Sequence, residues 1–228
     1  MRALLVEIQQ GRVDVEEGLR RLGRLPFADL GFASVDHHRA LRMGIPEVVL
    51  GLEKTPEQIA GIVSELLRTQ QNVLVTRVDA QKAERIRALG VELDYREQAR
   101  ALISIQTPPK RVCAEPVAIV TAGTSDIPVA AEAMVTLEAC GVPTREVFDV
   151  GVAGLHRLLA RVGELQAAPA VIVVAGMEGA LPSVVGGLLG APVIAVPTSV
   201  GYGAALGGLA ALMGMLNSCA SGVVCSWT

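Results

Sequence analysis

Aromatic side chains and an excess of positive charge are both scarce in this sequence of 228 residues. Phenylalanine, tryptophan and tyrosine together make up 3% of it, and the formal net charge is −3, from 20 basic and 23 acidic residues. Proteins that bind nucleic acid use aromatic platforms for the bases and a basic surface for the phosphates. We therefore expect no nucleic-acid partner.

Paired cysteines and a secretory signal are also lacking. No two of the four cysteines form a Cys-x-x-Cys pair, and the first residues do not contain the long apolar core of a signal peptide. Three histidines do not by themselves indicate a metal site, so the identity of any metal stays unknown at this point. We expect a cytoplasmic protein with reduced thiols.

Charge is distributed unevenly and divides the sequence in two. Residues 1–111 carry 17 of the Lys and Arg residues and 15 of the Asp and Glu residues, whereas residues 112–228 carry only 3 and 8. Between the halves, Pro108 and Pro109 make the chain unsuitable for a helix or a central strand. We predict a small amino-terminal α/β domain with a leading helix at residues 1–110 and an α/β catalytic domain at residues 111–228.

Residues 179–228 contain no charged side chain and no histidine. A membrane hairpin is one interpretation, because long uncharged apolar stretches are typical of spanning helices. However, Pro192 and Pro197 interrupt the first apolar window, the second window at 203–216 is short, and no Lys or Arg flanks either of them. We expect no membrane insertion, and instead a homo-oligomer that buries this region between subunits.

Apolar runs alternate with amphipathic stretches along the whole chain. In the first half we predict strands at 47–50, 73–76 and 91–95 and helices at 14–22, 55–69 and 79–89. In the second half we predict strands at 117–121, 144–148, 170–174 and 192–196 and helices at 128–140, 155–162, from 181, and 203–216. Uninterrupted apolar strands are typical of a parallel sheet covered on both faces. The predicted fold class is therefore α/β: a three-layer, doubly wound parallel sheet preceded by a small α/β domain.

Local signals mark one helix start and the loops in which function is expected. Thr55 to Gln58 have the N-cap hydroxyl, the proline and the glutamine of a capping box. In doubly wound sheets, ligands bind at the carboxyl ends of the strands. Four loops, at 122–127, 149–154, 175–182 and 197–203, are therefore the candidates for a binding site.

Two of these loops contain residues suited to a nucleotide. Gly123, Thr124, Ser125 and Asp126 follow the first strand of the second half, and their hydroxyls and free amides can hold a phosphate or a ribose. Ser125 or Asp126 could equally serve only as a helix cap. Glu178, the last acid in the chain, suits proton transfer or cation stabilisation, although a lone acid at a helix start can also be a dipole partner only.

Cys219 is the candidate for the chemical centre. It follows Asn217 and Ser218 where the last predicted helix ends, which places it in a loop, whereas Cys140 lies among Ala and Met on a helix and is interpreted as a core residue. In the first half, residues 34–39 place several polar side chains together, a pattern that a surface segment also explains.

Taken together, these motifs resemble a known family. From about residue 25 to 222 the chain is similar to the LarB-type enzymes of nickel-pincer nucleotide cofactor biosynthesis. The second half also resembles the aminoimidazole ribonucleotide carboxylase domain of purine biosynthesis, whose Gly-Ser-x-Ser-Asp phosphate loop matches residues 122–126 in kind. The residues that carry the LarB-type resemblance are Gly31-Phe32-Ala33, Asp36-His37-His38-Arg39, Gly44 to Glu47, Lys54 to Gln58, Thr121 to Asp126, Gly176 to Pro182 and Leu216 to Ala220.

The resemblance implies an activity. Enzymes of this family carboxylate the pyridinium ring of nicotinic acid adenine dinucleotide at C5 and hydrolyse its phosphoanhydride. The products are pyridinium-3,5-biscarboxylic acid mononucleotide and AMP. The resemblance further implies carbon dioxide or bicarbonate as co-substrate, no tightly bound cofactor, Mg²⁺ as a candidate ion, and an octamer.

The resemblance also implies roles for particular residues. Catalytic roles fall on Cys219 as the covalent nucleophile, on Glu178 in proton transfer or cation binding, and on Asp126. Substrate-binding roles fall on Gly123, Thr124, Ser125, Gly176, Met177, Gly179 and Ser218, and on Asp36, His38 and Arg39 from the amino-terminal domain.

Two departures keep alternatives open. The purine enzyme has a Ser-Ala-His-Arg segment after its second strand, and the corresponding residues 148–153 here contain neither histidine nor arginine. LarB-type relatives continue after the cysteine with a strand and a polar tail, so we expect an unfinished final strand in a sequence that ends at Thr228. A purine-pathway carboxylase or mutase and a non-catalytic nucleotide-binding module are the two alternative functions.

Overall fold

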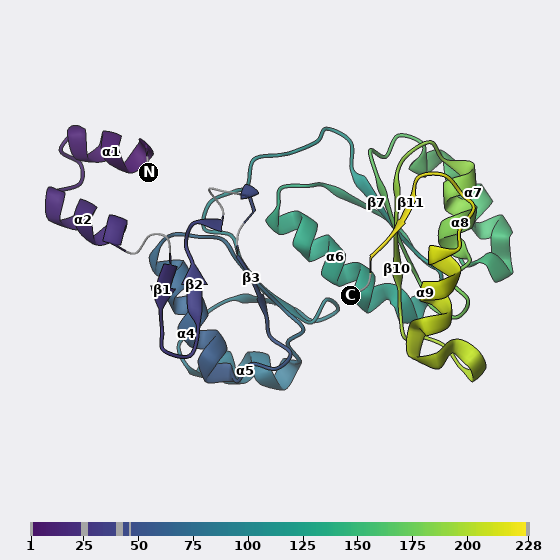
Figure 1. Cartoon of the computed structure of the whole chain (residues 1–228), viewed down its shortest axis with the longest axis horizontal. Coiled ribbons are helices and arrows are strands. Elements are labelled where there is room, and N and C mark those ends of the chain that lie inside the picture. The colour runs from purple at the N-terminus through teal and green to yellow at the C-terminus, as the bar shows by residue number, and fades with distance from the viewer. Residues whose placement is uncertain (1, 24–26, 40–42, 46, 227–228) are drawn as a thin grey trace. The chain divides into compact units, whose positions relative to one another are not determined.

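The computed structural model describes residues 2–23, 27–39, 43–45 and 47–226. The chain divides into two compact units: residues 1–94 with 102–107, and residues 95–101 with 108–228 (Figure 1). The short segment 95–101, which joins two strands of the first sheet, is thus grouped with the second unit. Among the described residues, no helix combines the length and the hydrophobicity that crossing a membrane requires.

Among the described residues, the first unit combines two leading helices, a β-hairpin and a four-stranded mixed sheet with two helices. Its elements are α1 (Arg2–Gln9), α2 (Val15–Gly23), β1 (Phe27–Asp29), β2 (Ser34–Asp36), β3 (Val48–Leu50), α4 (Pro56–Arg68), β4 (Val73–Thr76), α5 (Ala80–Ala88), β5 (Asp94–Arg96) and β6 (Ala101–Ser104). Strands β1 and β2 pair antiparallel, and the sheet has the order β3-β4-β6-β5, with β3 and β4 parallel and β4 and β6 antiparallel.

The predicted capping box at the start of α4 is confirmed. The backbone N–H of Gln58 donates to Thr55 Oγ1 at 3.2 Å, and the backbone N–H of Thr55 donates to Gln58 Oε1 at 3.0 Å. Pro56 occupies the first helical position, where its missing N–H has no partner to lose. Asp79 likewise caps α5, because its carboxylate accepts from the Lys82 N–H.

In the first half, one predicted strand is misplaced and three elements were not predicted. The strand predicted at 91–95 begins only at Asp94, and strand β6, helix α1 and the β1–β2 hairpin were not predicted. Strand β6 has only four residues, and nothing in so short an apolar run reveals that it pairs antiparallel with β4.

The second unit contains five strands that all run parallel, which confirms the predicted fold class. Its elements are β7 (Val117–Thr121), a 3₁₀ turn η1 (Thr124–Asp126), α6 (Ile127–Ala139), β8 (Thr144–Val147), η2 (Val152–Gly154), α7 (Leu155–Leu165), β9 (Val171–Ala175), α8 (Leu181–Leu188), β10 (Val193–Pro197), η3 (Gly203–Gly208), α9 (Leu209–Leu216) and β11 (Val223–Cys225). The strand order is β11-β10-β9-β7-β8, so in chain order the sheet reads 2-1-3-4-5. The final strand, which we expected to be unfinished, pairs with β10 over three residues.

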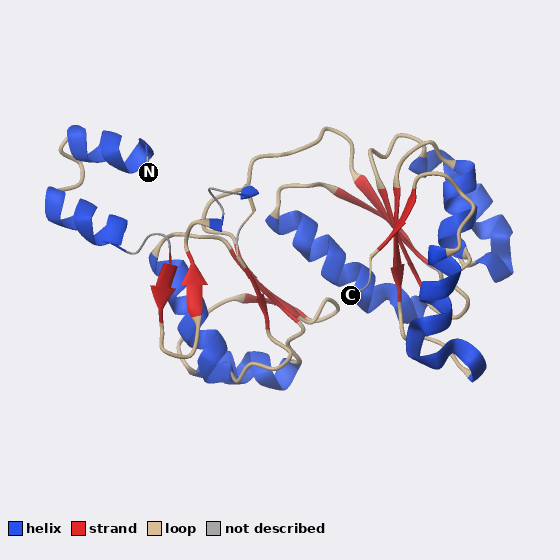
Figure 2. Cartoon of the chain, in the orientation of Figure 1, coloured by secondary structure: helices blue, strands red, loops and turns tan. Residues whose placement is uncertain are grey.

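Helices cover both faces of this sheet (Figure 2). Helix α6 packs on one face, where its Ala130 meets Ile119 and Val174. Helices α7, α8 and α9 pack on the other face around a larger core that includes Leu158 and Leu181. One helix therefore covers one face of five strands, whereas three helices cover the opposite face.

The helix predicted at 203–216 is wrong in its first half. Regular α-helix begins at Leu209, because Leu206, Gly207 and Gly208 all have left-handed backbone angles. Gly208 is the tightest of these positions, since a Cβ there would lie 2.8 Å from the carbonyl oxygen of Thr198. The chain after β10 thus folds back closely against the end of its own strand before α9 starts.

Candidate functional site

The strand order places a topological switch point between the carboxyl ends of β7 and β9. After β7 the chain crosses to β8 on one side, and β9 lies on the other side, so the direction of winding reverses between β7 and β9. Ligands of doubly wound sheets bind outside the carboxyl ends of the strands at such a reversal. The loops that begin at Gly123 and Gly176 follow these two strands and flank this position.

Asp126 connects the loop after β7 to the end of β10. Its Oδ2 accepts from the backbone N–H of Gly123 at 3.0 Å, and its Oδ1 accepts from Thr198 Oγ1 at 2.7 Å. Asp126 and Thr198 are both buried. Burial raises the pKa of the Asp126 carboxyl above its ordinary value, and the hydrogen bonds from Thr198 and Gly123 oppose part of that rise.

This geometry separates the roles of neighbouring residues in the loop. Asp126 does not cap α6 through its side chain, because its two oxygens are turned toward Gly123 and Thr198. Thr124 and Ser125 are exposed in the 3₁₀ turn η1, so their hydroxyls face solvent. Asp126 holds the loop, and the hydroxyls of Thr124 and Ser125 remain accessible to a ligand.

The loop after β9 is packed tightly by backbone contacts. A Cβ on Gly176 would lie 2.1 Å from the Val200 carbonyl oxygen, and the Met177 N–H donates to that same oxygen at 2.8 Å. Met177 has a left-handed φ of 52°, and Gly179, with φ of 67°, lies against the backbone of α9. Only glycine at 176 allows the ends of β9 and β10 to approach this closely.

Glu178 lies exposed between these tight positions. Its carbonyl oxygen is close to Gly214 of α9, where a Cβ would lie only 2.4 Å away. The loop after β9 is therefore fixed against α9, and the Glu178 side chain is free to face solvent.

Cys219 lies beyond the carboxyl end of α9, in the loop before β11. It is the one exposed cysteine among the four; Cys113, Cys140 and Cys225 are partly buried. The neighbouring Ser218 is held by Ser183 of α8, whose hydroxyl donates to Ser218 Oγ at 2.8 Å. In the described part of the chain, no hydrogen bond joins Cys219 to Asp126 or Glu178. Helix α8 contacts the Cys219 loop through Ser183, and helix α9, which precedes that loop, packs against the backbone of Glu178.

The three candidates from the amino-terminal half belong to the first unit. Asp36 Oδ1 accepts from the His38 N–H at 2.9 Å, and the Asp36 N–H donates to Glu47 Oε2 at 2.8 Å. Burial raises the pKa of Glu47, and the hydrogen bond from the Asp36 N–H opposes that rise. Nε of Arg39 is buried and has no hydrogen-bond partner within the described residues. Asp36 therefore shapes its own turn, while His38 and Arg39 are half-buried beside it.

Sequence reasoning missed two polar pairs. His37, rather than His38, is buried, with Nε2 3.2 Å from Glu65 Oε1. After β8, Arg157 Nη1 lies 2.7 Å from Asp149 Oδ2, and Asp149 has a left-handed φ of 56°. The signal for the second pair was present, because Arg157 stands four residues beyond the segment in which an arginine was sought.

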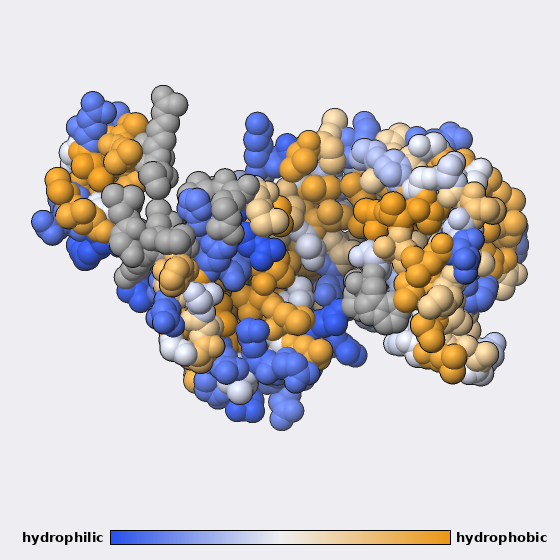
Figure 3. Space-filling model, in the orientation of Figure 1, coloured by the Kyte–Doolittle hydropathy of each residue, from blue (hydrophilic) through white to orange (hydrophobic). Residues whose placement is uncertain are grey.

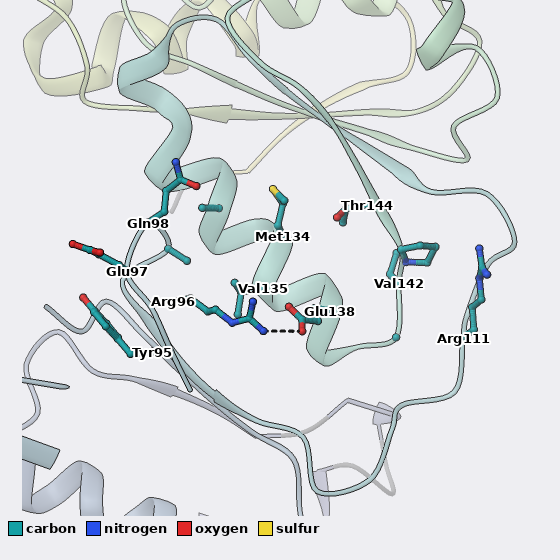
Figure 4. A pocket seen from close by; sticks show the side chains of 14 residues that line it. Tyr95, Arg96, Glu97, Gln98, Arg111, Met134, Val135, Glu138, Val142 and Thr144 are labelled. Carbon is teal, nitrogen blue, oxygen red and sulfur yellow. Dashed lines mark hydrogen bonds and ion pairs between the residues drawn. The ribbon is translucent and has the colours of Figure 1, made fainter. Parts of the chain in front are cut away.

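The hollow in Figure 4 lies elsewhere in the second unit. It is lined by one face of α6, including Met134 and Glu138, and by the residues before β8. An ion pair of 3.2 Å joins Glu138 to Arg96 across it. Because the residues before β8 form the amino edge of the sheet, this hollow is separate from the switch point at the carboxyl ends of β7 and β9.

A metal ion has no ready set of protein ligands. Among the described residues, no three His, Cys, Asp or Glu side chains are placed to hold one ion together. Mg²⁺ is commonly held by one or two carboxylates and by substrate phosphates.

The strand order and the helices on both faces place the protein in the class of doubly wound α/β proteins. Residues 27–107 match the model of the LarB/PurE-like N-terminal domain, and residues 116–227 match that of AIR carboxylase. An uncharacterized protein of Methanocaldococcus jannaschii is 35% identical over 231 residues, which cover 98% of this chain and 89% of that protein. The chain belongs to the LarB-type family, in which an AIR carboxylase-like domain follows a LarB-type amino-terminal domain.

Proposed function

We propose that this protein carboxylates nicotinic acid adenine dinucleotide at C5 of the pyridinium ring through a covalent Cys219 adduct, and hydrolyses the phosphoanhydride. The observation that carries the proposal is the exposed Cys219 thiol in a chain with the two domains of this family. Burial raises the pKa of the Cys140 and Cys225 thiols, which makes them poorer nucleophiles. Cys219 is therefore the best candidate for covalent chemistry.

The chemistry balances without an oxidant or reductant. The Cys219 thiolate adds to C4 of the cationic ring, which becomes a dihydropyridine. Its C5 is then the nucleophilic carbon of an enamine and attacks carbon dioxide to form the second carboxylate. Loss of the C5 proton and expulsion of the thiolate restore the aromatic pyridinium. Water then cleaves the phosphoanhydride and releases AMP and pyridinium-3,5-biscarboxylic acid mononucleotide.

The strand-end loops would hold the charged and sugar parts of the substrate. Thr124 and Ser125 offer exposed hydroxyls, and the backbone of Gly123 can approach a phosphate closely. Asp126 fixes this loop through Gly123 and Thr198. Glu178, which is exposed in the loop after β9, would assist proton transfer or stabilise a cation.

The backbone at Gly176, Met177 and Gly179 would contact the substrate from the other side of the switch point. The left-handed angles of Met177 and Gly179 turn the chain twice within this loop. From the first unit, Asp36, His38 and Arg39 remain proposed substrate contacts, since their turn presents half-buried polar groups.

We also propose that the working enzyme is a homo-oligomer. The sheet face that α6 covers leaves Val224 58% exposed next to its paired neighbour Ile194 on β10. Along α9 and the turn before it, Leu206, Met213 and Leu216 are also exposed. Figure 3 shows apolar residues gathered over the α8–α9 end of the second unit. Exposed apolar side chains that gather on one surface are typical of a surface that a partner covers.

The first test is to incubate the pure protein with nicotinic acid adenine dinucleotide and bicarbonate, and to analyse both the small molecules and the intact protein by mass spectrometry. We expect AMP and the dicarboxylated mononucleotide from the wild type and from Cys225→Ser, and neither product from Cys219→Ala. Product from Cys219→Ala would overturn the covalent role of Cys219. Turnover of aminoimidazole ribonucleotide, with none of the dinucleotide, would identify a purine-pathway carboxylase instead.

A further inference from the structure

Ser183 was not among the residues that the sequence identified, yet its side chain contacts the loop around Cys219. Its hydroxyl, in the first turn of α8, donates to Ser218 Oγ at 2.8 Å. The two serines are 35 residues apart in the chain. Nearby, Gly186 of α8 leaves room for the same loop, because a Cβ there would lie 3.2 Å from the Ala220 Cβ. Helix α8 is thus shaped to receive the residues on both sides of Cys219.

The hydroxyl of Ser218 is already used as an acceptor on two sides. It accepts from Ser183 Oγ and from the backbone N–H of Ala220, which lies 3.2 Å away. A serine hydroxyl has two acceptor lone pairs and one hydrogen. With both lone pairs engaged, Ser218 can offer an incoming group only its hydrogen.

We propose that Ser183 is a positioning residue that orients the Ser218 hydroxyl as a hydrogen-bond donor, beside Cys219, for an oxyanion of the substrate. This inference rests on the proposed function of Cys219. Ser218 then touches the substrate, and Ser183 acts through Ser218. No charged side chain occurs between residues 179 and 228, so a neutral donor is what this part of the chain can offer to an anion.

A hydroxyl donor suits an anionic oxygen, and two different groups of the substrate could supply that oxygen. A hydroxyl hydrogen suits a carboxylate oxygen, such as that on the pyridinium ring, and equally a phosphate oxygen. Cys219, whose thiolate would attack C4 of the ring, follows Ser218 directly. A ring carboxylate bound by Ser218 would therefore lie where C4 is close to the Cys219 sulfur. Ser218 would then help to select nicotinic acid nucleotides over nicotinamide nucleotides.

A readout that does not depend on turnover is alkylation of Cys219 by iodoacetate, which is anionic, compared with iodoacetamide, which is neutral. The two rates are measured for the Cys219 peptide by mass spectrometry on the folded protein. We expect the iodoacetate-to-iodoacetamide ratio to fall about three-fold or more in Ser218→Ala, and in the same direction but less in Ser183→Ala, since one hydrogen bond contributes a modest net amount. Ser183→Thr, which keeps the hydroxyl, should retain most of the ratio.

Ser221→Ala is the matched control, because Ser221 is an exposed serine in the same loop. Its ratio should equal that of the wild type. A change of both rates by the same factor in Ser183→Ala would indicate loop disorder and would overturn the proposal, as would an unchanged ratio in Ser218→Ala. These results are obtained even if the wild type does not turn over the dinucleotide, so the two proposals can fail separately.

Binding of mononucleotides distinguishes the two sources of the oxyanion. If the ring carboxylate is the ligand, Ser218→Ala weakens binding of nicotinic acid mononucleotide and leaves binding of nicotinamide mononucleotide unchanged. If the phosphate is the ligand, both weaken equally. No effect on either would contradict the donor role of Ser218.

Discussion

At the scale of single residues, Asp126 shows how one side chain can fix a binding loop. Its two oxygens join Gly123, three residues before it, to Thr198, which is 72 residues later in the chain. The carboxyl group is buried, and burial favours its neutral form over the charged form. The loop is therefore held by a group whose protonation depends on pH.

The first prediction concerns Asp126→Asn. A raised pKa in the folded state means that the stabilisation from protonation is present below the unfolded pKa and is lost as pH rises through the folded pKa. Asn keeps both contacts, since its oxygen accepts from Gly123 and its amide donates to Thr198, but it does not titrate. Relative to the wild type, we expect the free energy of unfolding of Asp126→Asn to increase between about pH 4 and about pH 7.

Urea unfolding at several pH values measures this difference, with exposed Glu115→Gln as the control for removing one carboxyl from the same unit. A difference between Asp126→Asn and the wild type that does not change with pH would contradict the assigned burial effect. The activity of Asp126→Asn tests separately whether the carboxylate also has a catalytic role.

At the scale of elements, the helices of the second unit use glycine in two ways. Gly163 of α7 is exposed, and a Cβ there would meet nothing within 4 Å. Gly214 of α9 lies against the Glu178 carbonyl oxygen, which a Cβ would approach to 2.4 Å. Glycine at 163 only weakens a helix, whereas glycine at 214 lets α9 pack against the loop after β9.

The second prediction follows from this contrast. Gly163→Ala should stabilise the protein by about 0.5–1 kcal/mol, because alanine loses less backbone freedom in a helix. Gly214→Ala should destabilise it by about 1–3 kcal/mol, because backbone must move to admit the methyl group. Denaturant unfolding of the two variants compares the same substitution in two helices, and equal effects would show that α9 is not packed as described.

At the scale of the whole molecule, the proposed homo-oligomer would cover apolar side chains that are exposed in one chain. Met213 on α9 is 49% exposed, and Leu89 after α5 in the first unit is 48% exposed. The two side chains are therefore equally accessible in one chain but lie in different units. Only Met213 belongs to the uncharged region that we expect other subunits to cover.

The third prediction uses this pair. Met213→Glu should shift the protein to smaller species in analytical ultracentrifugation, because a buried interface would have to accommodate an unpaired carboxylate. Leu89→Glu should leave the assembly unchanged. A wild type that sediments as a monomer, or equal sedimentation of Met213→Glu and the wild type, would exclude this surface as the interface.

Much of the second unit could be predicted because its signals are local. Continuous apolar runs predicted strands β7 to β10. In the first unit, an equally local signal, the capping box of Thr55 and Gln58, predicted the start of α4. The kink at Leu206 to Gly208 could not be predicted, since glycine-rich apolar sequence fits a helix as well as a turn. Strand β6 was missed because its pairing with β4 depends on residues far apart in the chain.

The sequence by itself determined that this protein has a parallel sheet, which loops follow its strands, and that residues 179–228 carry no charge. Periodicity and composition are properties of neighbouring residues, so they can be read without coordinates. Only the tertiary structure decided that Asp126 reaches Thr198, that Ser183 holds Ser218, and that Cys219 is the exposed thiol. These contacts join residues brought together by folding, and burial and hydrogen bonding, unlike periodicity, exist only once the chain is packed.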